Sequence, residues 1–256
     1  MLFGREYMPE GAGVDPDAPR KKGAARLLEI LSRDLDGIFL SGALAMLACA
    51  PAAILAGVAL WLGSLPLCLL AAVAAGWLVG PALTSLYDTI LRALRDEPGF
   101  WWHTYKRVWK QSFKSSLVPG IVFTLLWTLV AYAAFVLPQL TEVSAGFGLV
   151  LVVDMVLLLT LGSYFWMQNA LFETSLSQKL SNCVRMFLGF LPRTALSAAF
   201  QLGYWLLMAA VIPRCAFIFL LTGLWVPNLL AAMAVYAPVE KSLHLEEQIR
   251  AKQETN

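Results

Sequence analysis

The sequence predicts an all-α integral membrane protein with about six transmembrane helices and two amphipathic cytoplasmic connections. Hydrophobic residues make up 59% of its 256 residues and charged residues only 14%. The mean hydropathy is +0.68, which is unlike the composition of soluble proteins. Between Asp36 and Asp88 the chain carries 51 consecutive residues without a charge, enough for two spans of about 20 residues each. The alternating pattern of a β-barrel is absent, so helices are expected to satisfy the backbone hydrogen bonds in lipid.

The predicted elements follow from the positions of charges, prolines and glycines. Residues 1–36 form a polar cytoplasmic tail, whose Arg20-Lys21-Lys22 run and prolines argue against a cleavable signal peptide. A membrane domain covers 37–239, and residues 240–256 form a cytoplasmic C-terminal tail. The six predicted spans are roughly 38–62, 65–92, 115–138, 146–170, 194–213 and 215–238, and the cytoplasmic amphipathic connections lie at about 95–114 and 171–193.

The distribution of lysine and arginine predicts the orientation, because cationic flanks stay in the cytoplasm. The chain has 19 Lys and Arg residues, and only Arg214 falls in a connection on the other side of the predicted membrane domain. Both termini are therefore expected in the cytoplasm, which agrees with an even number of spans.

Small residues recur every four positions in the second predicted span. They are Ala72, Gly76, Gly80 and Thr84, and Asp88 extends the series. Such a ridge lets another helix approach closely. Pro81 cannot donate a hydrogen bond to the carbonyl of Trp77, so the helix is expected to kink there. Helix packing is the favoured interpretation of this motif, and a hinge or gate is the alternative.

The segment after the charged turn at 95–99 is predicted to be an amphipathic helix over about 100–114. Its aromatic arc includes Trp101, Trp102, Tyr105, Trp109 and Phe113, and its basic arc includes Lys106 and Lys110. This arrangement is typical of a helix at the level of the lipid headgroups or of a surface that contacts a partner. No nucleic-acid binding is expected, because the topology rule already explains basic residues beside membrane spans.

The connection at 171–193 repeats this pattern more weakly, and a second membrane-surface or bundle-capping helix is expected there. Its apolar side includes Leu176, Leu180, Cys183 and Val184, opposite Gln178 and Arg185. Each connection follows a span directed inward and precedes one directed outward. Residues 65–138 and 146–213 are therefore candidates for two related halves.

Asp154 is the only acidic or basic residue well inside a predicted span. A carboxylate at this depth suggests a proton, ion or polar ligand site. The alternatives are a hydrogen bond to a neighbouring helix and a wet position near the outer surface. Asn228 is a second candidate polar site, with Gln168, Asn169 and Gln201 as further ones; a helix–helix hydrogen bond is the more common role of such side chains.

Neither a metal, nor a cofactor, nor an enzymatic activity is expected. Cysteines occur at four positions and histidines at two, without ligand spacing. A disulfide between Cys68 and Cys215 is conceivable, although packing of small apolar side chains is the simpler interpretation. No HExxH, GxSxG or P-loop motif occurs, and no pair of carboxylates shares a helical face inside the membrane.

Two segments of the chain resemble the YesL family, bacterial multi-pass membrane proteins with a domain of unknown function. The first is GPALTSLYDTILRALRDEPGFWWHTYKRVWKQSFKSS at 80–116, with its GPA-aliphatic-T and LY pattern, its R-D-E-x-G turn and the aromatic, basic stretch that follows. The second is NALFETSLSQKLSNCVRMFLGFLPRTAL at 169–196. Asp88 departs from the family pattern, which has an apolar or aromatic residue there. No catalytic residues are known in the family that could be transferred.

The resemblance implies a protein of the bacterial plasma membrane that accompanies carbohydrate uptake systems. We therefore expect a non-enzymatic accessory or regulatory component. Its expected partners are the lipid bilayer and, through the small-residue ridge and the aromatic segment, the membrane subunits of a sugar importer. The alternative is an independent small-solute transporter or channel that uses Asp154 as its ionisable site and Pro81 as its hinge.

Overall fold

The computed structural model describes residues 21–97, 100–144, 146–211 and 215–243, and the secondary structure in these ranges is helical. The helices are α1 (Gly23–Trp61), α2 (Leu65–Arg95), α3 (Trp101–Phe135), α4 (Leu137–Leu140), α5 (Phe147–Leu171), α6 (Leu176–Gly189), α7 (Leu191–Val211), α8 (Ala216–Thr222) and α9 (Trp225–Leu243). Among the described residues, five segments are long and apolar enough to cross a membrane: α1, α2, Trp101–Leu140, α5 and α7. The predicted all-α membrane fold class is confirmed, with five such segments in place of six.

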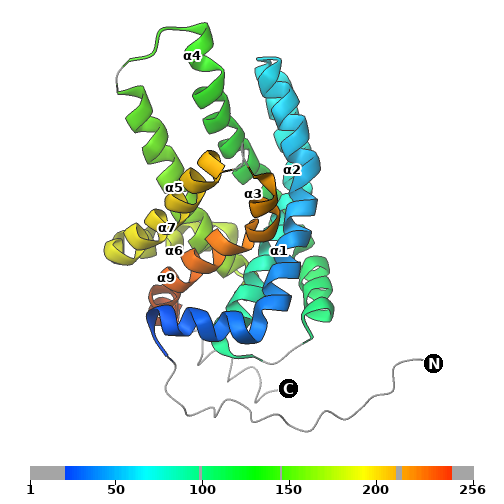
Figure 1. Ribbon diagram of the computed structural model, residues 1–256, viewed down its shortest axis with the longest axis vertical. Coiled ribbons are helices and arrows are strands. Elements are labelled where there is room, and N and C mark those ends of the chain that lie inside the picture. The colour runs from blue at the N-terminus through cyan, green and yellow to red at the C-terminus, as the bar shows by residue number, and fades with distance from the viewer. Residues whose placement is uncertain (1–20, 98–99, 145, 212–214, 244–256) are drawn as a thin grey trace, which may run out of the picture.

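The first part of α1 lies across one end of the bundle, and the rest of the helix turns to run along the bundle (Figure 1). α1 begins at Gly23, inside the segment 1–36 that the sequence predicted as a polar tail. The correction has a simple cause, because Leu27, Ile30 and Leu31 pack on the core from one face of this part of the helix. Residues 1–20 of the predicted tail, Arg214 and residues 244–256 lie outside the described ranges.

α3 runs without a break from Trp101 to Phe135. The separate surface helix predicted for 100–114 is therefore the first part of a long helix that continues into the apolar segment. Residues 101–118 contain no proline or glycine that would end a helix, and Pro119 is accommodated inside α3. In the same way, α2 continues through Pro81 to Arg95.

The last predicted span, 215–238, is interrupted. α8 ends at Thr222 and α9 begins at Trp225, with Gly223 between them at a φ of 43°. Glycine adopts such a conformation readily, and a Cβ atom added to Gly223 would lie 2.2 Å from the Met46 sulfur. Both the backbone angle and the close contact with α1 thus favour glycine at the break. The prediction of one continuous helix is wrong because a single glycine in an apolar run is a weak signal.

α6 occupies the second predicted connection as a separate amphipathic helix. Ser175 caps it in a capping box, in which the Gln178 backbone N–H donates to the Ser175 hydroxyl oxygen and the Ser175 N–H donates to the Gln178 side chain. The face toward the bundle carries Lys179, Cys183 and Met186. The predicted apolar side is therefore turned partly outward, since Leu176, Leu180 and Val184 are exposed.

The core is concentrated at the end of the bundle where α1 begins. α2 is buried almost continuously from Val79 to Arg95, and α5 from Leu159 to Asn169. Toward the other end, where α4 lies, α5 separates from α3 (Figure 1). Leu149 and Val150 at the start of α5 are exposed there, as expected for side chains that face lipid.

Candidate functional site

The small-residue ridge of α2 is covered by α3 of the same chain. A Cβ atom on Gly76 would lie 2.3 Å from the Ile121 Cα, and one on Gly80 would lie 2.3 Å from the Ser116 carbonyl oxygen. The Thr124 hydroxyl donates to the Ala72 carbonyl oxygen at 2.7 Å, and the Thr84 hydroxyl donates to the Gly80 carbonyl oxygen at 2.9 Å. The ridge is therefore a helix-packing seam within the chain, which leaves no room there for a helix of a partner.

Asp88, the last member of the predicted series, is buried and pairs with Arg92 one helical turn later, with 2.8 Å between Arg92 Nε and Asp88 Oδ2. Asp88 is the first charged residue of α2, and Arg92 and Arg95 follow before the helix ends. Arg95 pairs with Glu97 at 2.7 Å. The charges of this segment are thus largely neutralised by one another.

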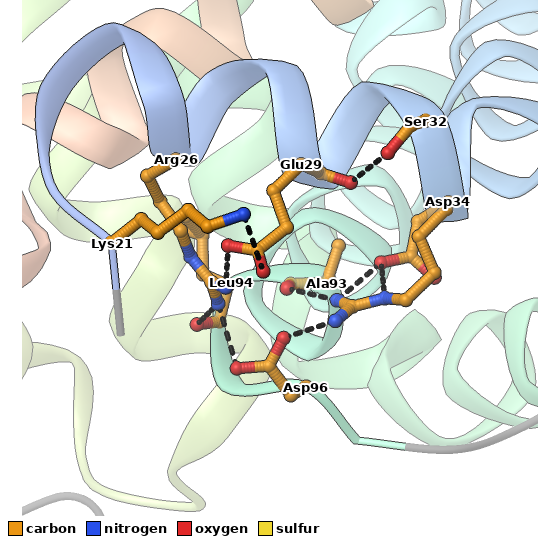
Figure 2. Close-up of polar contacts among 9 residues, drawn as sticks. Lys21, Arg26, Glu29, Ser32, Asp34, Ala93, Leu94 and Asp96 are labelled. Carbon is orange, nitrogen blue, oxygen red and sulfur yellow. Dashed lines mark hydrogen bonds and ion pairs between the residues drawn. The ribbon is translucent and has the colours of Figure 1, made fainter. Parts of the chain in front are cut away.

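The turn after α2 is tied to the first part of α1 (Figure 2). Arg26 Nη2 donates to Asp96 Oδ2 at 2.7 Å and to the Leu94 carbonyl oxygen at 2.9 Å, and Arg33 pairs with the other oxygen of Asp96. Burial of Asp96 acts to raise its pKa, but the hydrogen bonds and charges of Arg26 and Arg33 outweigh burial and hold the pKa below its usual value. This cluster explains why the polar start of α1 is helical and docked.

A buried polar network joins four helices beside the seam. Asn169 Nδ2 lies 2.9 Å from both the Thr84 and the Ser116 hydroxyl oxygens, and Lys179 Nζ donates to Asn169 Oδ1 at 2.7 Å. The Lys179 side chain on α6 is only 3% exposed. Burial lowers the pKa of Lys179, opposed by the charge of Glu173. The network therefore attaches α6 to α2, α3 and α5 through one buried ammonium group.

A cavity of about 410 Å³ lies between α2, α3, α5, α7 and the start of α9, and Cys49 of α1 also lines it. Its aromatic lining consists of Tyr87, Phe123, Trp127, Trp166 and Trp205. No Asp, Glu, Lys, Arg or His side chain is part of the described lining. The volume falls within the range of about 300–1,000 Å³ that is usual for small-molecule sites, which also combine aromatic walls with a few polar groups.

The polar groups of the cavity form a chain that links four helices. Tyr87 Oη on α2 donates to Asn228 Oδ1 on α9 at 2.8 Å, and lies 3.3 Å from Ser163 Oγ on α5. Gln201 Nε2 on α7 lies 3.1 Å from the same Ser163 oxygen. The Trp166 indole N–H is buried and has no acceptor among the described residues. The cavity lining thus carries hydroxyl and amide groups.

The interruption of the last apolar segment opens onto this cavity. Leu224, Pro227 and Asn228, at and just after the break, are part of its lining. Tyr204 Oη donates to the Gly223 carbonyl oxygen at 2.6 Å, which satisfies a backbone group that the break would otherwise leave without a partner. Broken helices at membrane depth are tolerated where they line a cavity, and in transporters they form binding sites.

The predicted aromatic arc at the start of α3 contacts the rest of the bundle in part. Tyr105 is 4% exposed, and Trp101, Trp109 and Phe113 are half-buried. Trp102 is exposed, and the Lys106 ammonium lies 5.4 Å from the centre of its ring. Lys110 is exposed. These residues therefore lie on the flank of α3, away from the cavity.

Asp154 and Asn228 are not brought together. Asn228 lines the cavity. Asp154 is half-buried on α5 and is not part of the described lining, although the next residue, Met155, is. Asp154 has no hydrogen bond or ion pair with another described residue. Sequence reasoning missed Tyr87, Ser163 and the three tryptophans, because tyrosine, serine and tryptophan are ordinary residues of a membrane span. Gln201 was one of the further polar candidates, and unlike Asp154 it lines the cavity.

The described cysteines, Cys49, Cys68, Cys183 and Cys215, are all free thiols. Among the described residues no group of three His, Cys, Asp or Glu side chains is placed to hold a metal ion. The described lining of the cavity consists of uncharged side chains.

Comparison with protein families gives a match to a family described as "Protein of unknown function, DUF624", over residues 54–133. The matched region runs from the second part of α1 through α2 and most of α3. It includes the glycine seam and Tyr87, but not Ser163, Gln201 or Asn228. Neither the curated proteins nor the solved structures give a match.

Proposed function

We propose that this chain is a non-enzymatic protein of the bacterial plasma membrane that serves as an accessory or regulatory component of carbohydrate uptake. Both termini face the cytoplasm in this proposal, in line with the charge distribution. The likeness of residues 80–116 to the YesL family motivates the assignment, and the match of 54–133 to a domain of unknown function is compatible with it.

The observation that carries the proposal is the uncharged aromatic cavity. A saccharide is a neutral ligand, with C–H groups on the faces of its ring and hydroxyl groups at its edge. Trp127, Trp166 and Trp205 supply flat apolar surfaces. Gln201 and Asn228 carry amides that both donate and accept hydrogen bonds. These groups favour a small polyhydroxylated solute over an ion, and the protein would sense or transfer such a solute beside an importer.

The surface for an importer subunit is a separate part of the proposal. The ridge of α2 is covered, so the accessible candidates are the exposed residues of the aromatic segment, such as Trp102, and the exposed apolar side of α6. Leu176, Leu180 and Val184 form that side of α6. A membrane partner would bury these leucine and valine side chains.

Co-purification tests the accessory role. The tagged protein is isolated from its native membranes in mild detergent, and the recovered proteins are identified by mass spectrometry. We expect permease or ATPase subunits of a sugar importer, and their loss in a variant with Leu180→Gln and Val184→Gln. Gln139→Ala, an exposed change on α4, is the matched control. Recovery of the protein without any transport subunit would count against the accessory role.

A second candidate is independent transport of a small solute, which the interrupted α8–α9 segment favours. Asp154 is the residue predicted for proton or ion coupling in that case. Flux of labelled saccharide into vesicles that contain the protein alone tests this candidate, with Asp154→Asn as the diagnostic variant. Flux that is lost with Asp154→Asn would support it. Absence of flux for the unchanged protein would exclude it, and equal flux of the two proteins would remove Asp154 from the mechanism.

A further inference from the structure

A second hollow lies on the outside of the bundle, where α1, α2 and the first part of α3 meet. It is a groove of about 360 Å³ that is separate from the cavity. Leu44, Leu47 and Leu78 line it on α1 and α2, and Trp102, Lys106 and Lys110 line it on α3. No acidic side chain is part of its described lining.

The two ends of the groove differ in chemistry. α2 and α3 are antiparallel neighbours in which Gly80 lies against Ser116, so Leu78 is level with residues near 118 of α3. Lys106 is about 12 residues before that level, or roughly 18 Å at the rise of an α-helix. The groove therefore runs from an apolar part beside the membrane-spanning segments to a cationic part near the start of α3. Side chains of a helix lean toward its N-terminus, which directs both lysines to the cationic end.

A buried tyrosine forms part of the wall of the same groove. Tyr105 is part of the lining, is 4% exposed, and its hydroxyl has no hydrogen-bond partner among the described residues. The Trp102 ring holds the Lys106 ammonium at 5.4 Å by a cation–π contact, so this charge is already positioned at the mouth.

We propose that this groove binds one anionic phospholipid, with an acyl chain along Leu44, Leu47 and Leu78 and the phosphate at Lys106 and Lys110. The charge of the two lysines complements a phosphate, and a lipid is the ligand that combines an anionic head with a long apolar tail. The occupied leaflet is the one on the side of the Arg26–Asp96 cluster. The site does not depend on the proposed function, because the described linings of the groove and of the cavity have no residue in common.

Native mass spectrometry of the delipidated protein tests the proposal. Phosphatidylglycerol and phosphatidylcholine with identical acyl chains are added in turn, and the fraction of protein that retains one lipid is measured. We expect retention of phosphatidylglycerol at much lower lipid concentration. Lys106→Gln together with Lys110→Gln should weaken this binding by about thirtyfold, the effect of removing two lysine–phosphate attractions at a membrane surface.

The control is Arg107→Gln together with Lys114→Gln, which removes the same charge from exposed positions of α3 outside the groove. This variant should bind phosphatidylglycerol as the unchanged protein does. Equal weakening in both double variants, or equal binding of the two lipids, would overturn the proposal. Soluble glycerol phosphate should bind far more weakly than the lipid; equal affinity would mean that the apolar part of the groove contributes nothing.

A further variant keeps the test independent of the charges. Leu47→Trp places a larger side chain in the apolar part of the groove and should reduce retention of phosphatidylglycerol. Size-exclusion elution together with thermal unfolding in detergent shows whether each variant is folded. Dimers of the protein in place of lipid adducts, with the same dependence on Lys106 and Lys110, would instead identify a second copy of the chain as the occupant and contradict the proposal.

Discussion

The two candidate halves of the chain, 65–138 and 146–213, each contain a pair of long helices, α2 with α3 and α5 with α7, and the two pairs pack in different ways. In the first half, α2 and α3 meet along a glycine seam in which Gly76, Gly80 and Gly120 bring the two backbones together. In the second half, α5 and α7 are held apart and bridged by side chains. The Tyr164 and Thr194 hydroxyl oxygens lie 3.0 Å apart, and Gln201 Nε2 reaches Ser163 Oγ at 3.1 Å.

The difference shows how two pairs of long helices in one bundle can pack closely in one case and leave a cavity in the other. Helices without side chains at the contact close completely, whereas tyrosine, glutamine and tryptophan between α5 and α7 leave the cavity on one side of them. Gly203 of α7 has open space where a Cβ atom would be added, so glycine alone does not close a seam. A facing helix with a small residue at the same level is also needed.

The largest expected effect is the loss of the seam. Gly80→Leu places a side chain where even a Cβ atom would lie 2.3 Å from a backbone oxygen. Because backbone atoms cannot yield as a flexible side chain does, we expect a destabilisation of about 3 kcal/mol or more. Thermal unfolding in detergent measures it. Gly203→Ala, in open space on α7, should leave the protein as stable as before or slightly more stable; similar losses for the two variants would refute the contrast between the halves.

The second effect concerns the network that connects the two halves. Asn169→Leu removes the only described acceptor of the buried Lys179 ammonium and both hydrogen bonds to Thr84 and Ser116. We expect a loss of about 2–3 kcal/mol, because a charged donor is left without a partner. Asn169→Asp should recover much of the stability, since a carboxylate accepts from the ammonium and from the two hydroxyl groups. If the aspartate variant is as unstable as the leucine variant, Lys179 does not depend on this partner.

A smaller effect is expected where the first half is tied to α1. Asp96→Asn keeps a residue type that tolerates the left-handed conformation at φ 62°, and weakens the ion pairs with Arg26 and Arg33. We expect a loss of about 1 kcal/mol at neutral pH.

The pH dependence of stability gives an independent measure of the ion pairs between Asp96 and the two arginines of α1, Arg26 and Arg33. The pKa of Asp96 is lowered in the folded protein, so its contribution is present above the pKa of the unfolded chain, near ~4, and is lost as the pH falls through the lower folded value. The difference in melting temperature between the unchanged protein and Asp96→Asn should therefore shrink on acidification. A difference that grows at low pH would mean that Asp96 is not held as a carboxylate.

The smallest effect on stability is expected in the cavity. Tyr87→Phe removes one hydroxyl that donates to Asn228 and should lower stability by about 1 kcal/mol or less. Saccharide binding should weaken more clearly, by about tenfold, because Asn228 loses the partner that orients it. Isothermal titration calorimetry measures both proteins; an unchanged affinity would place the ligand away from Tyr87.

Much of the fold follows from the sequence, because charge positions and hydropathy define the apolar segments directly. The ridge at Ala72, Gly76, Gly80 and Thr84 was predicted from its spacing, although its partner proved to be α3 of the same chain. The docked start of α1 was not predicted, since it depends on Arg26 and Arg33 meeting Asp96, which is distant in the sequence. Pairing of distant charges cannot be read from spacing along one helix.

The candidate site was predicted only in part. Asn228 lies in the cavity, but Asp154, the more conspicuous residue, lies outside the lining. The cavity depends on the break at Gly223 and on how far α5 and α7 are held apart, and both are consequences of tertiary packing. Lys179 was not predicted as a buried residue, because an amphipathic pattern places a lysine on the solvent face. It is buried because its ammonium group donates a hydrogen bond to Asn169 of α5.

Calorimetric titration of the purified protein tests whether the cavity recognises a neutral saccharide. Monosaccharides and disaccharides are compared with charged solutes of similar size, for the unchanged protein and for Gln201→Met, an isosteric apolar change in the lining. We expect saturable binding of at least one saccharide that is lost or reduced by about tenfold or more in Gln201→Met, with Gln139→Ala unaffected. Binding of charged solutes in preference to saccharides, or saccharide binding that is equal in Gln201→Met, would contradict it.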